Sequence, residues 1–104
     1  MTTIAACIEE GRYLDTRHAT ERQHERQILR SDVLHVLQDG YHEKRKDTFD
    51  ESFKAWNYAI RGKTVDKKDL RIIVSFDSAG MLIITAIDLS KEVKNENKNS
   101  KRIH

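Results

Sequence analysis

Three side chains that could act on a phosphodiester recur at four-residue intervals near the start of the chain: His18, Arg22 and Arg26. On a helix this spacing stacks them along one face, with a rise of about 6 Å per step. Histidine can serve as acid or base near neutral pH, and the planar guanidinium group matches phosphate oxygens in a bidentate way. Metal-free cleavage of RNA needs an acid, a base and cations beside the phosphate. We therefore predict that these three residues are catalytic, with the two arginines holding phosphate.

Further residues could bind the RNA around this stripe. Arg17 adds charge at the N-terminus of the same helix, and Tyr58 could donate a proton or stack on a base. Three more cations are expected to approach from the sheet. The predicted RNA-binding residues are Arg17, Tyr58, Arg61, Lys63 and Arg71.

Each of these features has a structural alternative. Histidine and arginine at this spacing also occur on solvated helices, where Glu21 and Glu25 would pair with Arg26 and with other neighbours four or five residues away. The basic run 44–46 could protect an edge strand from aggregation instead of binding nucleic acid. Trp56 and Tyr58 could belong to the core instead of a stacking platform.

Other chemistries lack the residues they need. The five histidines include no His-x-x-x-His pair and have no cysteine pair or carboxylate cluster beside them, so we predict no metal and no cofactor. No serine lies in a nucleophile elbow. Cys7, the only cysteine, lies among apolar neighbours and is expected to be a small buried side chain.

The composition fits one soluble domain in a reducing, cytoplasmic compartment. The chain has 104 residues, of which 38% are hydrophobic and 35% are charged. It contains no apolar run of membrane-spanning length and no secretory pattern at its start, so no membrane partner is expected. The five basic and two acidic residues of segment 91–104 contribute +3, leaving −1 on the other 90 residues. We expect a single domain over residues 1–90 and a basic, disordered tail over 91–104.

The hydrophobic pattern changes from helical to alternating after Gly40. Helices are expected over residues 3–11, from near His18, and from an N-cap at Ser31 to Gly40, with a short extended link over 13–17. Strands are expected over residues 41–47, 53–61, 70–76 and 81–89, the last two joined by the tight turn 77–80. This order predicts an α+β domain, with N-terminal helices packed on an antiparallel sheet of about four strands.

The helical segment also resembles a known signature. His18-Ala19, Arg22, Arg26, Ile28, Asp32-Val33, Leu37 and Gly40 resemble the pattern of a small bacterial family of a domain of unknown function. The strand-like segment 58–62, which ends in glycine, and the hairpin over 70–89 resemble the rest of that family. The resemblance covers residues 4–89. More distantly, the family is similar to the RelE/MqsR-like toxins of bacterial toxin–antitoxin systems, compact α+β ribonucleases that act without metal.

The resemblance implies a toxin that cleaves mRNA and is covered by a cognate antitoxin, often a zinc-finger protein. RelE-like enzymes often draw on basic and tyrosine residues at the C-terminal end of the sheet, whereas this chain has Thr85-Ala-Ile-Asp-Leu89 there. A second class of function therefore stays open, a non-catalytic module of the same fold that binds RNA or an acidic protein. A homodimer also remains an open alternative.

Overall fold

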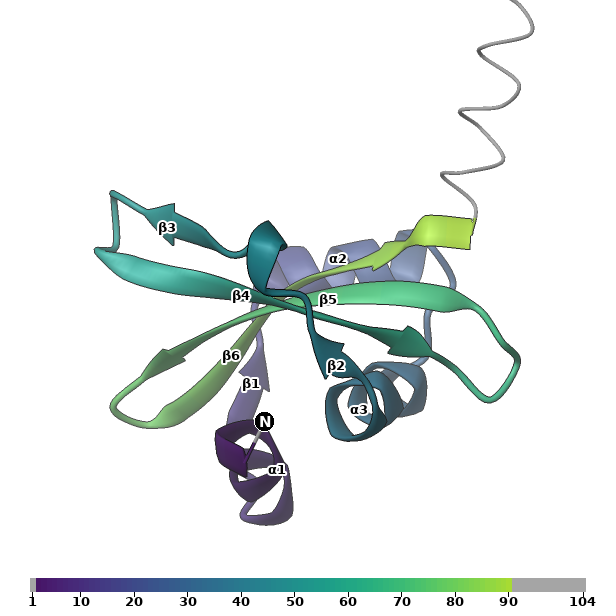
Figure 1. Ribbon diagram of the computed structural model, residues 1–104, viewed down its shortest axis with the longest axis horizontal. Coiled ribbons are helices and arrows are strands. Elements are labelled where there is room, and N and C mark those ends of the chain that lie inside the picture. The colour runs from purple at the N-terminus through teal and green to yellow at the C-terminus, as the bar shows by residue number, and fades with distance from the viewer. Residues whose placement is uncertain (1, 91–104) are drawn as a thin grey trace, which may run out of the picture.

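The computed structural model describes residues 2–90, which form three helices and a six-stranded mixed sheet (Figure 1). The class is α+β, as predicted. Along the chain the elements are α1 (Thr2–Glu9), β1 (Tyr13–Asp15), α2 (Arg17–Glu25), α3 (Arg30–Asp39), β2 (Tyr41–His42), the 3₁₀ helix η1 (Lys44–Lys46), β3 (Thr48–Asp50), β4 (Ala55–Lys63), β5 (Asp69–Asp77) and β6 (Gly80–Asp88). The predicted tail, 91–104, lies outside the described residues.

The sheet is larger than predicted, and one of its strands is parallel. Its order is β1-β6-β5-β4-β2, and β3 pairs with the other end of β4. The predicted meander of β4, β5 and β6 is confirmed, with antiparallel pairing throughout. β1 pairs in parallel with β6, and β2 and β3 share one edge of β4. These extra strands have two or three residues each, too few to show an alternating pattern in the sequence.

The core joins one face of the sheet to the helices α1 and α3, which lie beneath the sheet in Figure 1, and it includes Ala19 of α2. Alternate residues of the long strands face these helices, as the period of a strand requires. Cys7 of α1 is buried in this core, as predicted. The fully buried aliphatic side chains include Ile4, Val33, Val36, Ile60, Leu70, Ile72, Val74 and Ile83.

Helix α2 continues the chain beyond β1 and lies beside β6, with which β1 pairs only as far as Ile83. The Thr16 amide donates to the Ile83 carbonyl at 3.0 Å, and the Thr16 hydroxyl donates to the Ile84 carbonyl at 3.2 Å. The same hydroxyl accepts the Ala19 N–H at 3.1 Å, so Thr16 is the N-cap. The helix expected near His18 thus begins at Arg17.

Two local predictions were wrong. Helix α3 begins at Arg30, so its N-cap is Leu29 and not Ser31. The Leu29 N–H donates a hydrogen bond to the Asp32 carboxylate at 3.2 Å. The expected single strand over residues 41–47 ends at His42, where the chain turns into η1. The basic run 44–46 is therefore not a guard on a strand.

Gly40 lies where α3 meets the sheet, and it has no room for a side chain. A Cβ atom there would lie 2.4 Å from the Arg61 carbonyl oxygen and 2.5 Å from that of Val36. We expect Gly40→Ala to lower the free energy of unfolding by about 2 kcal/mol, because backbone must shift to admit the methyl group. Urea denaturation would measure the change. Gly11→Ala is the control, since Gly11 has a positive φ of 69° but open space around it. A Gly40→Ala loss no larger than that of Gly11→Ala would contradict the expectation.

Candidate functional site

Of the predicted catalytic stripe, His18 and Arg22 lie on α2 and Arg26 is the C-cap that follows it, and both arginines contact other groups of the protein. His18 is exposed. Arg22 forms an ion pair with Glu25 at 2.7 Å, and Arg26 donates to the main-chain carbonyl of Ala86. Arg17 is exposed and lies 3.4 Å from Glu21. Glu21 and Glu25 therefore pair with Arg17 and Arg22, and not with Arg26 as the structural alternative expected. The catalytic assignment stays a prediction.

Arg26 has a measurable structural role. Its guanidinium group donates a hydrogen bond to the Ala86 carbonyl, on a part of β6 whose edge faces α2 and not another strand. We expect Arg26→Met to lower the free energy of unfolding by about 1–2 kcal/mol, because the carbonyl loses a charged donor while the apolar part of the side chain is kept. Chemical denaturation checks this, with Arg17→Met as the matched control on an exposed arginine. Equal stability of the two variants would show that the bond contributes little.

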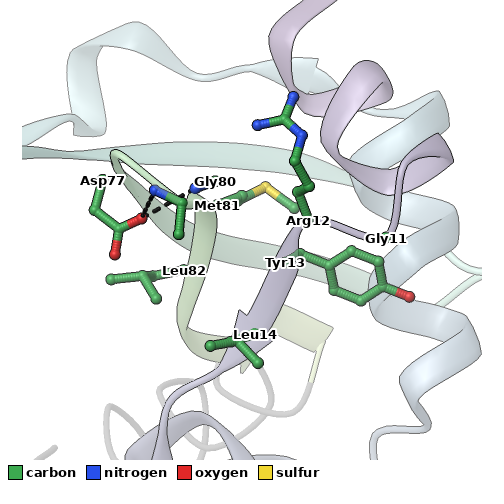
Figure 2. A pocket seen from close by; sticks show the side chains of 9 residues that line it. Gly11, Arg12, Tyr13, Leu14, Asp77, Gly80, Met81 and Leu82 are labelled. Carbon is green, nitrogen blue, oxygen red and sulfur yellow. Dashed lines mark hydrogen bonds between the residues drawn. The ribbon is translucent and has the colours of Figure 1, made fainter.

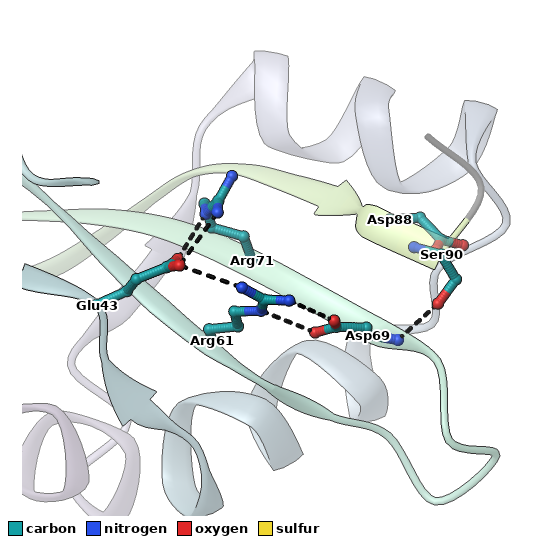
Figure 3. A network of polar contacts seen from close by, with 6 residues as sticks. All are labelled: Glu43, Arg61, Asp69, Arg71, Asp88 and Ser90. Atoms are coloured by element: carbon teal, nitrogen blue, oxygen red, sulfur yellow. Dashed lines mark hydrogen bonds and ion pairs between the residues drawn. The ribbon is translucent and has the colours of Figure 1, made fainter. Parts of the chain in front are cut away.

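The structure brings together two of the predicted RNA-binding residues of the sheet, Arg61 and Arg71. They face each other across β4 and β5, and both bind the buried carboxylate of Glu43, whose side chain is 5% exposed (Figure 3). Arg71 donates to its two oxygens at 2.7 and 3.2 Å, and Arg61 donates at 3.3 Å. The hydrogen bond from Arg71, reinforced by its charge and by Arg61, lowers the pKa of Glu43 although burial opposes this.

A second carboxylate completes this network. Asp69 accepts two bonds from Arg61, at 3.1 and 2.7 Å, and these bonds are the main reason that the pKa of Arg61 is raised. The Asp69 N–H donates to the Ser90 hydroxyl at 3.0 Å, which links β5 to the residues after β6 (Figure 3). The charges of the two arginines are balanced by those of the two carboxylates. Arg61 and Arg71 therefore bind carboxylates of the protein itself.

Lys63 and Tyr58, the other predicted sheet residues, make none of the hydrogen bonds or ion pairs of this network. Lys63 is exposed at the end of β4 and registers with Asp69. Tyr58 is partly buried and packs against the core. Its ring lies edge-on to His42, with centroids 5.8 Å apart, and 5.9 Å from Phe76.

The sequence did not reveal a histidine–carboxylate pair beside Tyr58. His42 Nε2 lies 2.8 Å from a carboxylate oxygen of Asp47, and the two side chains are 20% and 12% exposed. The other oxygen of Asp47 accepts the Ala59 N–H at 3.0 Å, which fixes the carboxylate against β4. An imidazole oriented in this way by a half-buried carboxylate has the geometry of a general acid or base.

His42 and Asp47 meet because the chain turns at η1, between them. The sequence placed His42 on a strand edge, and β2 does include it. In a continuous strand, residues 42 and 47 would have pointed to opposite faces because their separation is odd. The 3₁₀ turn folds Asp47 back onto His42, and a sequence pattern with the period of a strand cannot indicate it.

Exposed aromatic side chains lie on the same edge of the sheet. Phe49 and Trp56 register with each other across β3 and β4, with ring centroids 5.6 Å apart at 69°. They are 43% and 49% exposed, so the alternative that placed Trp56 in the core is wrong.

The pockets of residues 2–90 include two that lie away from His42. One, of about 140 Å³, lies between residues 11–14 and the β5–β6 turn (Figure 2). The Asp77 carboxylate beside it is bonded to the Ala79 and Gly80 amides, and Arg12 pairs with Glu10. The other, of about 320 Å³, opens beside Asp50, Phe53, Asn57 and Ser75. The residues that line the two pockets include no histidine or cysteine, so neither pocket contains a histidine–carboxylate pair like that of His42 and Asp47.

Residues 2–90 contain no group of three metal-ligating side chains close enough to hold an ion. None of the helices in that range is long and apolar enough to cross a membrane.

Comparison with known proteins identifies the family. No curated protein matches the chain, and no solved structure matches it. The family model for a domain of unknown function, DUF4258, matches residues 16–88. That range runs from the N-cap of α2 to the end of β6 and contains the helix stripe, the His42–Asp47 pair and the arginine network. The chain is therefore a member of the DUF4258 family.

Proposed function

We propose that this protein is a metal-independent endoribonuclease and the toxin of a bacterial toxin–antitoxin pair. The His42–Asp47 pair is the observation that carries the proposal, because it supplies an oriented acid–base group without a metal. The resemblance of the family to RelE/MqsR-like toxins supports the same class of reaction. A cognate antitoxin, often a zinc-finger protein, is the expected partner.

The reaction would proceed by attack of the RNA's own 2′-hydroxyl. With Asp47 holding Nε2–H, His42 Nδ1 carries the lone pair and takes the proton from the 2′-hydroxyl. The O2′–P bond forms while the P–O5′ bond breaks, which leaves a 2′,3′-cyclic phosphate. The leaving 5′-oxygen takes a proton from the Tyr58 hydroxyl, whose ring lies beside the imidazole. The exposed cations of η1, Lys44, Arg45 and Lys46, offset the growing charge on phosphorus.

The α2 residues enter this proposal as a second candidate centre. His18 is exposed on α2, so its imidazole is open to a substrate, and Arg22 remains able to offer its other donors to phosphate. A His18→Ala/Arg22→Ala variant tests this centre separately from His42.

The toxin role is tested in cells. Induced expression of the wild-type chain in a bacterial host is expected to arrest growth, and co-expression of the protein encoded beside it should restore growth. The His42→Gln variant, at equal protein level, should leave growth unaffected. Growth arrest by His42→Gln as strong as that by the wild type would contradict the proposed centre.

One observation favours a non-catalytic binding module instead. Arg22, Arg61 and Arg71 all face carboxylates of the protein, so fewer guanidinium groups are available to hold a phosphorane. A binding module would show salt-sensitive association with RNA or with an acidic protein and no product. The same purified protein, assayed for products and for binding, distinguishes the two functions.

A further inference from the structure

Three large aromatic side chains, Phe49, Phe53 and Trp56, are left in solvent on the hairpin of β3 and β4, which projects beyond the helices in Figure 1. Phe49 and Trp56 lie side by side there, each more than two-fifths exposed. Burying the apolar surface that each ring exposes to water would contribute about 25 cal/mol per Å² of favourable free energy. Exposure of such a pair indicates a surface for a partner.

The aromatic pair continues the face that carries the proposed acid–base group. Trp56, Tyr58 and Ile60 alternate along β4 and so point to one side of the sheet. His42 registers with Ile60, and Phe49 registers with Trp56, which places both on that side. Phe49, Trp56, Tyr58 and His42 therefore form one row, with about 7 Å between alternate residues of a strand.

Cations lie next to this row along the chain, in η1 between His42 and Phe49. Lys44, Arg45 and Lys46 are exposed, and none of the ion pairs or side-chain hydrogen bonds within residues 2–90 involves them. Lys46 is only three residues from Phe49, or roughly 10 Å of extended chain. In contrast to Arg61 and Arg71, these charges are available to a ligand.

We propose that Phe49 and Trp56 form a stacking platform for the bases of single-stranded RNA, with the RNA phosphates against Lys44, Arg45 and Lys46. The inference deepens the proposed function by naming the single-stranded substrate and the surface that holds it. Exposed aromatic rings beside free cations match a ligand that presents a flat base and a negative charge at each nucleotide. A second copy of this chain fits less well, because a symmetric dimer through this edge would bring its basic clusters together.

Trp56 is the only tryptophan of the chain, so its fluorescence reports directly on the platform. A uridine decanucleotide, titrated into the His42→Gln protein to prevent cleavage, is expected to quench it. Inorganic polyphosphate, which carries charge but no bases, should bind without comparable quenching. Full quenching by polyphosphate, or none by the oligonucleotide, would overturn the proposal.

Matched variants separate stacking from charge. Phe49→Leu, which keeps an apolar side chain, is expected to weaken binding of a labelled decanucleotide about 5- to 100-fold. Replacing Lys44, Arg45 and Lys46 with alanine should reduce the slope of log K against log salt by about 2. The control is Lys67→Ala/Lys68→Ala at the opposite end of β4, with binding unchanged. Circular dichroism confirms that each variant is folded.

Unchanged affinity in folded Phe49→Leu would contradict the platform. Concentration-dependent burial of Trp56 without RNA would assign the surface to a dimer, and binding of an acidic protein but not of RNA would assign it to a protein partner. Either result overturns the proposal. If the decanucleotide binds with quenching but wild-type protein makes no product, the platform stands and the nuclease proposal fails.

Discussion

Replacing Glu43 with glutamine is expected to lower the free energy of unfolding by about 3 kcal/mol. The carboxylate is 5% exposed and is the acceptor for Arg71, which is itself only 17% exposed. Removing one member of a buried ion pair leaves the other charge uncompensated, which costs far more than the pair contributes as a whole. Urea denaturation at neutral pH measures the loss, with Glu51→Gln on the exposed surface as the control.

The pH dependence of stability gives an independent check on Glu43. Its pKa is lower in the folded protein because Arg71 and Arg61 bind the charged form. The corresponding stabilisation is complete above the unfolded pKa of about 4.3 and is lost as the pH falls through the folded value. The difference in stability between the wild type and Glu43→Gln should therefore shrink in acid. A difference that stays constant from pH 7 to pH 3 would show that the carboxylate's charge is not what stabilises the fold.

Replacing His42 with glutamine is expected to slow RNA cleavage about 10²- to 10⁴-fold, the usual contribution of a positioned acid or base. Glutamine can still donate a hydrogen bond to Asp47 but cannot take up a proton in the reaction. The rate of cleavage of a labelled single-stranded RNA measures the effect.

The matched control is His35→Gln on α3. His35 also faces a carboxylate, with Nδ1 3.1 Å from Asp39, but that pair lies on the exposed helix surface. Its loss should leave the rate unchanged. If instead His18→Ala/Arg22→Ala abolishes cleavage and His42→Gln does not, the catalytic centre lies on α2.

The longest elements could be predicted from the sequence, because their patterns extend over many residues. β5 and β6 are rich in β-branched residues, and the turn at 77–80 predicted their hairpin. Gly40 marked the end of α3. The extended link over 13–17 was predicted, but the parallel pairing of β1 with β6, and the short strand β3, depend on their partner strands. The predicted N-cap at Ser31 was wrong because the helix starts where the Asp32 carboxylate accepts a hydrogen bond from the Leu29 N–H.

The site was less predictable because its contacts depend on the fold. Residue type indicated Arg61 and Arg71, but their shared partner Glu43 lies 18 and 28 residues away in the chain. Spacing predicted the stripe on α2, yet the carbonyl that binds Arg26 is 60 residues away. The His42–Asp47 pair needs η1 between its members. Such pairings are set by register and turns, which a single sequence does not reveal.

The most direct test of the proposed nuclease is cleavage of single-stranded RNA by the purified wild-type chain with EDTA present. We expect cleavage to continue in the chelator and to leave 2′,3′-cyclic phosphate ends, because His42 and Tyr58 would move the protons without a metal. Cleavage that stops in EDTA and returns with a divalent cation would contradict this account, as would the absence of any product both with and without added ribosomes.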